Sequence, residues 1–343
     1  MSDKMSYSEF SNMPTAEVET VPFYFYVVEG TLLSCTSLFM VFLILITSKL
    51  RSQKEYQIFI LCVFFDAIFG VAYISAGVHR LQLISHYERV PLASRWQCIN
   101  YLHNHVFVFV TPGAGILALL TSVDRFFSVF LPLKYIKVPA GRYFFILITI
   151  LIVSTVPTTV LSYVYSYANG PLKDVNAMCL LVQGVTPDMF LALRATRILT
   201  TIIAVLLYVP IAIRMYYVIK RSAAFNIKVG QASKLRRMTL TVSLITLSQL
   251  VLFTLPDTIL FFKPDMQSMV FYVMNLNKGI LNVIIFFVTQ RDLRKALLQR
   301  ISSLLGKKFR NIVEIEVSSI QNADSSTRRD RKNTSVTPVR FLR

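Results

Sequence analysis

Charged residues are scarce in this 343-residue chain, at 16% of the sequence, whereas a soluble domain carries about 25%. Hydrophobic residues make up 54%, which disfavours a soluble enzyme and favours a membrane protein. Four cysteines without a CxxC pair are too few for a disulfide scaffold, and they predict no structural zinc or other metal site. Glycine (11) and proline (13) are not enriched, which excludes a collagen-like chain.

Acidic residues are half as numerous as basic ones, 18 against 36, which gives a formal net charge of +18. Clustered basic residues are typical of nucleic-acid binding. Here, however, nearly all of them lie in short segments between apolar runs and in the carboxyl-terminal tail, so we expect no nucleic-acid partner. The sequence contains no P-loop, no HExxH motif and no convincing Ser-His-Asp triad, and we expect neither an enzyme nor a cofactor.

Seven long apolar windows follow one another from Val21 onward, and the mean hydropathy of the chain is +0.56. Each window is long enough to cross a hydrocarbon core of about 30 Å as a helix. They cover residues 22–47, 56–78, 100–131, 143–165, 197–219, 238–262 and 268–289. The sequence therefore predicts an all-α fold, a seven-transmembrane helix bundle over residues 22–289.

Lysine and arginine in the short loops predict the orientation of this bundle, because cytoplasmic loops collect positive charge. One side carries Lys49, Arg51, Lys54, Lys134, Lys137, Arg142, Arg214, Lys220, Arg221, Lys228, Lys234, Arg236 and Arg237. The other side carries fewer basic residues, and Glu88, Asp174, Asp188 and Asp265 dilute them. Residues 1–21 are therefore expected outside the cell, in a plasma-membrane protein whose carboxyl terminus is cytoplasmic.

The hydrophobic period changes after the seventh window. Over residues 290–305 the apolar side chains fall on one helical face, namely Leu293, Leu297, Leu298, Ile301, Leu304 and Leu305. A helix of this kind lies in the headgroup plane rather than across the bilayer. Residues 306–343 are basic and rich in serine and threonine, without an apolar period, and predict a disordered tail.

An acid–base pair, Asp124-Arg125, is followed by the aromatic Phe126 at the cytoplasmic end of the third window, with Pro132 and Tyr135 farther along. Charged residues at the end of a span are often only anchors at the membrane surface. This segment also resembles the rhodopsin-like G-protein-coupled receptors. The resemblance implies that the aspartate restrains the arginine at rest. The released arginine then contacts a heterotrimeric G protein, beside the basic pair Arg236 and Arg237.

Asp66 lies in the middle of the second window, where a carboxylate without a partner is costly. It is therefore expected to face the bundle interior and to have a partner. The resemblance implies that this partner is Asn282, in a pocket for water or sodium. The family's Asn-Pro-x-x-Tyr motif here reads Asn282-Val283-Ile284-Ile285-Phe286, so a water-mediated switch at Phe286 would lack the tyrosine hydroxyl.

Cys98 and Cys179 both lie on the predicted outer side, where the oxidising environment permits a disulfide. The same resemblance implies that they are bridged. Three prolines, Pro112, Pro210 and Pro256, interrupt spans and are candidate hinges, although prolines also occur in membrane helices for local packing reasons.

The departures from the rhodopsin-like pattern are typical of another group. Thr254 stands where the family usually has tryptophan, two residues before Pro256. With these departures and with its segment 124–135, the chain resembles the nematode serpentine chemoreceptors of the Srsx or Srbc type.

Biogenic amines and retinal are disfavoured as ligands. The position of the amine-binding aspartate holds Phe107, and that of the retinal-binding lysine holds Leu276. The mouth of the bundle still offers polar and aromatic side chains, each of which has a helix-packing role as its alternative. The candidate ligand residues are His103, His105, Phe107, Thr111, Gln249, Thr254, Asp257, Asn275 and Lys278.

The sequence thus predicts a chemosensory G-protein-coupled receptor for an extracellular small-molecule or peptide ligand. Serines and threonines in the tail are candidate phosphorylation sites that would recruit arrestin. A ligand-gated channel or a transporter remains the alternative class, although charged residues deep in the spans are sparse for an ion path.

Overall fold

The computed structural model describes residues 18, 20–168, 170, 173–225, 229–262 and 269–305. Within the described helices, side chains are described except at 218–238, 260, 269–273, 275, 299 and 301–305. The chain divides into two units, Met1–Thr289 and Gln290–Arg343. The first unit holds the predicted bundle. In the second, α13 covers Arg291–Leu305, within the range 290–305 predicted as an amphipathic helix, and its place at a membrane surface remains a prediction.

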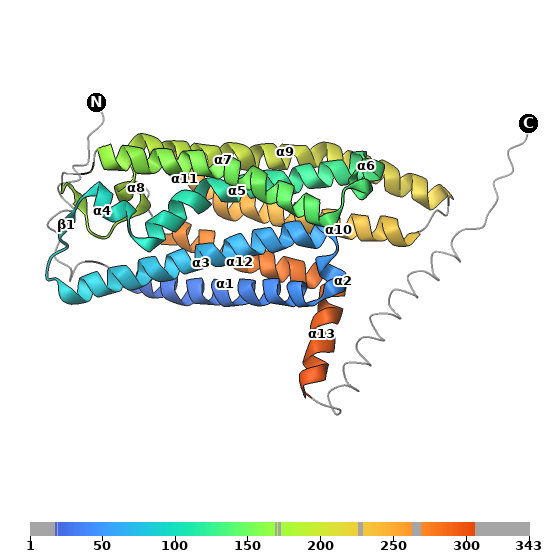
Figure 1. Cartoon of the computed structure of the whole chain (residues 1–343), viewed down its shortest axis with the longest axis horizontal. Helices are drawn as coiled ribbons and strands as arrows, with labels where there is room; N and C mark the ends of the chain where they lie inside the picture. The colour runs from blue at the N-terminus through green and yellow to red at the C-terminus, as the bar shows by residue number, and fades with distance from the viewer. Residues whose placement is uncertain are drawn as a thin grey trace, which may run out of the picture. The chain divides into compact units, whose positions relative to one another are not determined.

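Long helices make up nearly all of the first unit (Figure 1). In chain order they are α1 (Val21–Ile46), α3 (Lys54–His86), α5 (Leu102–Phe130), α7 (Ala140–Ala168), α9 (Pro187–Phe225), α10 (Val229–Gln249), the π-helical turn η3 (Leu250–Thr254), α11 (Leu255–Phe262) and α12 (Met269–Thr289). Within the described residues, six helices are long and apolar enough to cross a bilayer, and Leu276–Thr289 is a shorter apolar helix. The predicted helical membrane bundle is confirmed.

Helix ends differ most from the prediction at α9, which begins at Pro187 rather than at residue 197. The apolar window missed this extension because Asp188 and Arg194 interrupt it. Proline is well placed at the first position of a helix, since its missing N–H has no partner there in any case. The extension places Arg194 on the same continuous helix as Arg197, so both side chains are held on a rigid element.

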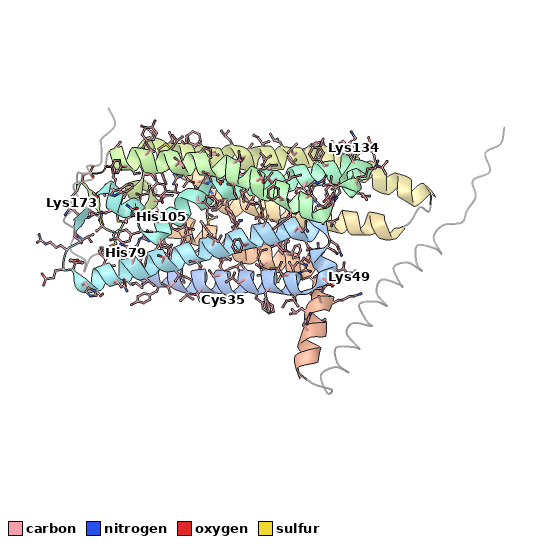
Figure 2. All side chains as sticks on the ribbon, in the orientation of Figure 1. Cys35, Lys49, His79, His105, Lys134 and Lys173 are labelled. Carbon is pink, nitrogen blue, oxygen red and sulfur yellow. A yellow bond between two sulfur atoms is a disulfide. The ribbon has the colours of Figure 1, made fainter. Side chains whose placement is uncertain are left out.

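Short elements close the two ends of the bundle. One end, called the outer end below, carries β1 (Leu92–Ala93), α4 (Arg95–Ile99), β2 (Val175–Asn176) and α8 (Leu181–Gly184). The opposite, inner end carries α2 (Ser48–Arg51) and α6 (Pro132–Lys137). Figure 2 shows Lys49 and Lys134 at the inner end, with Lys173 and His79 toward the outer end.

Small residues let α1 and α3 pack closely along their length. A Cβ added at Gly30 would lie 2.8 Å from the carbonyl oxygen of Gly70, and one added at Gly70 would collide with the Ser34 hydroxyl. Ser34 also donates to the carbonyl of Ala67 across the same seam, at 3.1 Å. Close backbone approach of this kind is a common way for helices to associate where lipid removes the hydrophobic driving force.

The core of the unit lies between α3, α5, α7, η3 and α12, where Phe65, Leu117, Leu151, Phe253 and Leu276 are buried together. Outward faces of α7 and α9 remain strongly apolar, and Phe145 on α7 is 71% exposed. In water such a surface would be unstable, but in a bilayer it contacts acyl chains. The burial pattern therefore supports a membrane-spanning bundle.

The sixth long helix is interrupted at the predicted hinge. α10 passes into the π-helical turn η3 at Leu250–Thr254, and α11 follows with Pro256 as its second residue. Proline has no N–H to donate, and a π turn is one way in which a helix accommodates such an irregularity. Pro112 and Pro210 lie inside α5 and α9, both of which continue through them. Hinge motion at these prolines remains a prediction.

Candidate functional site

The Asp124–Arg125 pair lies near the inner end of α5 and is almost fully buried. The Nε of Arg125 donates to Oδ2 of Asp124 at 2.8 Å, and Nη2 of Arg125 donates to the same oxygen. Both side chains are only 1% exposed. A membrane-surface anchor would extend toward water, so this burial favours an internal restraint over a simple anchor.

Two tyrosines and a lysine complete the surroundings of this pair. The Tyr143 hydroxyl of α7 donates to Oδ1 of Asp124, so both carboxylate oxygens are bound. The Tyr135 hydroxyl of α6 accepts from Nη2 of Arg125 at 3.5 Å, and burial raises the pKa of Tyr135 above its usual value. The Lys54 ammonium donates to the Tyr135 carbonyl and lies 4.4 Å from the centre of its ring.

Tyr143 and Lys54 were not predicted as part of this site. Both lie at the ends of predicted spans, where an aromatic or basic residue is ordinary, and no spacing relates them to Asp124. The predicted Phe126 instead stacks on Phe130, with ring centres 4.4 Å apart. Arg236 and Arg237 fall within α10, but their side chains lie outside the described residues.

Asp66 forms an ion pair in the bundle interior. Its Oδ1 accepts from Nζ of Lys278 at 3.0 Å, and its Oδ2 accepts from Nδ2 of Asn282 at 3.3 Å. Ser248 of α10 donates to Oδ1 of Asn282 at 3.0 Å. The expected contact between Asp66 and Asn282 is therefore present, and it connects α3, α10 and α12.

Lys278 does not lie where the sequence prediction placed it. It was a candidate for the ligand-binding mouth, whereas the structure pairs it with Asp66 at 10% side-chain exposure. A buried carboxylate attracts the nearest cation strongly, and Lys278 lies one helical turn before Asn282 on α12. The ammonium thereby balances the charge of the Asp66 carboxylate within the protein.

Phe286 belongs to an aromatic cluster rather than to the polar network in which it was predicted. Its ring stacks on Phe59 and lies edge-on to Tyr56, with ring centres 5.9 Å apart in the second contact. The side chain has no hydrogen-bonding group, so packing is the role that its chemistry permits.

A second buried ion pair lies nearer the outer end, between α9 and α11. Arg197 contacts Asp257 with both side chains under 10% exposed, and Nε of Arg194 lies 4.0 Å from the same carboxylate. The Arg197 guanidinium also lies 4.2 Å from the ring centre of Phe253. Asp257 was predicted to face a ligand, and the structure gives it a partner within the protein instead.

The disulfide between Cys98 and Cys179 is present and ties α4 to the segment after β2. Side chains from α3 and α5 hold that segment as well. Nε of Arg80 donates to the Met178 carbonyl at 3.1 Å, and Nε2 of His103 contacts the Cys179 carbonyl at 3.2 Å. His103 is fully buried. It supports the loop, whereas it was predicted as a ligand residue.

The remaining candidate ligand residues do not share one site. His105 is exposed and hydrogen-bonds to Tyr163, whereas Phe107 packs edge-on against Phe69 and Tyr73. Nε2 of Gln249 donates to the Ala114 carbonyl at 3.2 Å. Thr111 and Thr254 are buried, and the side chain of Asn275 lies outside the described residues.

One cavity is lined both by Arg125 of the Asp124–Arg125 pair and by the Asp66–Lys278 ion pair, and it is called the inner cavity below. It lies between α3, α5, α10 and α12. Arg125 and Glu55 line one part of it, and Asp66 and Lys278 line another. Of the nine candidate ligand residues, Gln249 and Lys278 line it. The cavity therefore belongs to the region of the Asp124–Arg125 pair rather than to the predicted mouth.

Comparison with known proteins agrees with this architecture. No curated protein matches the chain. Residues 33–298 match the family described as serpentine type 7TM GPCR chemoreceptor Srsx, and this range covers most of the chain and of the bundle. The chain belongs to the Srsx family of serpentine seven-transmembrane G-protein-coupled chemoreceptors.

Proposed function

We propose that this receptor couples an extracellular small-molecule or peptide ligand to a heterotrimeric G protein at the inner end of the bundle. The observation that carries the proposal is the buried Asp124–Arg125 pair beside the inner cavity. Arg125 is restrained by a neighbouring carboxylate, and its surroundings come from several helices that a rearrangement would separate. No enzymatic activity is part of the proposal.

The inner end is proposed to face the cytoplasm of the plasma membrane. Basic residues gather there, as Figure 2 shows for Lys49 and Lys134, and the disulfide lies at the opposite end. Residues 1–21 would then be extracellular, whereas α13 would lie on the cytoplasmic membrane surface. The tail at 306–343, outside the described residues, would be the substrate for kinases and a contact for arrestin.

Activation is proposed to be a population shift between two conformers. The ligand stabilises a conformer in which the inner half of the sixth helix, α10, moves outward and Arg125 is released from Asp124. The π turn and Pro256 provide an irregular segment at which such a movement can pivot. The binding of ligand and the binding of G protein are thermodynamically linked. The G protein must therefore increase the receptor's affinity for ligand by the same factor by which the ligand increases its affinity for the G protein.

Replacing Arg125 tests this proposal. Reporter cells are first screened with volatile compounds and peptides to find a ligand, and nucleotide exchange is then measured on purified receptor with a panel of G proteins. We expect Arg125→Gln to lose ligand-stimulated exchange while surface expression persists. Arg142→Gln, an exposed arginine at the inner end of α7, is the matched control and should retain exchange. Normal exchange in Arg125→Gln would contradict the proposed role.

Replacing Tyr143 should have the opposite effect. Tyr143→Phe removes the hydroxyl that binds Oδ1 of Asp124 and leaves the ring in place. A hydrogen bond to a charged group contributes about 1.5–3 kcal/mol, so its loss should raise ligand-independent exchange by about tenfold to a hundredfold. Exchange without ligand is the measurement, with the exposed Tyr216→Phe on α9 as control. If basal exchange is the same in both variants, Tyr143 does not restrain the pair.

A further inference from the structure

The walls of the inner cavity are mainly apolar and aromatic. Phe59, Phe65, Phe69, Phe253 and Phe286 all line it, and aliphatic side chains of α5 and α10 fill much of the remainder. Sites for small molecules are typically concave and apolar, with a few polar groups that fix the orientation of the ligand. These walls favour a lipophilic occupant.

Arg125 lines this cavity and carries a buried polar atom without a hydrogen-bond partner among the described residues. Its Nε and Nη2 bind Asp124, but the buried Nη1 has no hydrogen-bond acceptor among the side chains and backbone that the structure describes. The residue is 1% exposed and lines the cavity. A buried donor of this kind is unfavourable when left unpaired, and a ligand oxygen would satisfy it.

The charges around the cavity indicate that this oxygen is neutral. Asp124 already balances Arg125, and Lys278 already balances Asp66. Glu55 also lines the cavity and adds a negative charge near Arg125. A carboxylate or phosphate would therefore be placed among groups that are already paired or of like charge, whereas a ketone or ester oxygen accepts a hydrogen bond without adding charge.

We propose that the inner cavity binds a neutral lipophilic molecule carrying one carbonyl acceptor, such as a long-chain ketone, whose oxygen accepts from Nη1 of Arg125. Such molecules cross and dissolve in membranes, so they reach a site in the inner half of the bundle. The binding site is independent of the proposed signalling function. The effect of binding on signalling does rest on the proposed function. A molecule bound beside Arg125 would exclude the G protein and lower nucleotide exchange.

Photo-crosslinking of the full receptor in lipid nanodiscs tests the binding site. The probe is dodecan-2-one with a diazirine in its chain, and its sites of attachment are mapped by mass spectrometry. The competitors are dodecan-2-one, dodecane, which lacks the acceptor, and dodecanoic acid, which adds a negative charge. We expect attachment to cavity-lining residues of α3 and α12, and competition by the ketone at a concentration about tenfold below that of either other compound.

Two variants separate the cavity from the surrounding lipid. Ala118→Phe fills the cavity from α5 and should reduce attachment about tenfold, whereas Val153→Phe, on an exposed face of α7, should leave it unchanged. Arg125→Met should make the ketone no better a competitor than dodecane. If Ala118→Phe does not fold, the competitor series on the native receptor still decides the question.

Three outcomes would overturn the site: attachment only at lipid-facing residues, equal competition by dodecane, or strongest competition by dodecanoic acid. The signalling consequence is measured separately, as ligand-independent nucleotide exchange with and without dodecan-2-one. Attachment with unchanged exchange would overturn the consequence and leave the site standing. Lost attachment with normal exchange would overturn the site and leave the proposed function standing.

Discussion

Replacing Lys278 with methionine is expected to lower the free energy of unfolding by about 3–5 kcal/mol, the usual cost of removing one partner from a buried ion pair. Among the described residues, Asp66 would then keep only the amide of Asn282, at 3.3 Å, to bind one of its oxygens in the bundle interior. Denaturant or thermal unfolding of the purified receptor in detergent measures the loss. Lys49→Met, at an exposed lysine of α2, is the control and should change stability little.

The double variant Asp66→Leu/Lys278→Met makes the test specific to the pair. Two apolar side chains of similar size remove the carboxylate and the ammonium together, so no uncompensated charge is left. We therefore expect the double variant to be more stable than Lys278→Met alone. If the effects of Asp66→Leu and Lys278→Met simply add, the two groups do not stabilise each other.

Loss of the Cys98–Cys179 disulfide should have the second-largest effect. The bridge closes a loop with a sequence separation of 81 residues, for which chain entropy allows up to about 4 kcal/mol of stabilisation. Cys98→Ser and Cys179→Ser should each reduce surface expression and thermal stability by similar amounts. The double variant should be no worse than either single variant, since the first substitution already breaks the bond.

The free cysteine Cys35 provides the control for the disulfide prediction. It is exposed on α1, so Cys35→Ser should leave expression and stability unchanged. Additive defects in the Cys98→Ser/Cys179→Ser double variant would contradict the prediction. They would indicate that each cysteine contributes through packing, since both side chains are fully buried.

The positions of the long helices could be predicted because the bilayer imposes a simple rule on composition. A window must be apolar and about 20 residues long, and seven windows satisfied that rule. The ends of α9 could not be found in this way, because its outer turns carry Asp188 and Arg194 and continue beyond the apolar window. The π turn before Pro256 leaves no mark on hydropathy, and only the proline indicated an irregularity.

Pairing between distant helices was the part of the site that sequence alone did not supply. Asp66 was expected to have a partner because an unpaired carboxylate inside a membrane is unfavourable in free energy. Asn282 was named as that partner through the resemblance to rhodopsin-like receptors. Lys278 was missed because its position was judged against the retinal register and the mouth of the bundle rather than against Asp66. Tyr143 was missed for a similar reason, since its contact with Asp124 depends on how α5 and α7 pack.

The ion pair between Asp66 and Lys278 also has a consequence for biosynthesis. Its partners are 212 residues apart in the sequence. At a synthesis rate of about 5–20 residues per second, the ribosome needs roughly 10–40 s to reach Lys278 after it has added Asp66. During that interval α3 has left the ribosome with a carboxyl group whose ammonium does not yet exist. The nascent chain must therefore depend on the insertion machinery, or on water that enters with it, until α12 arrives.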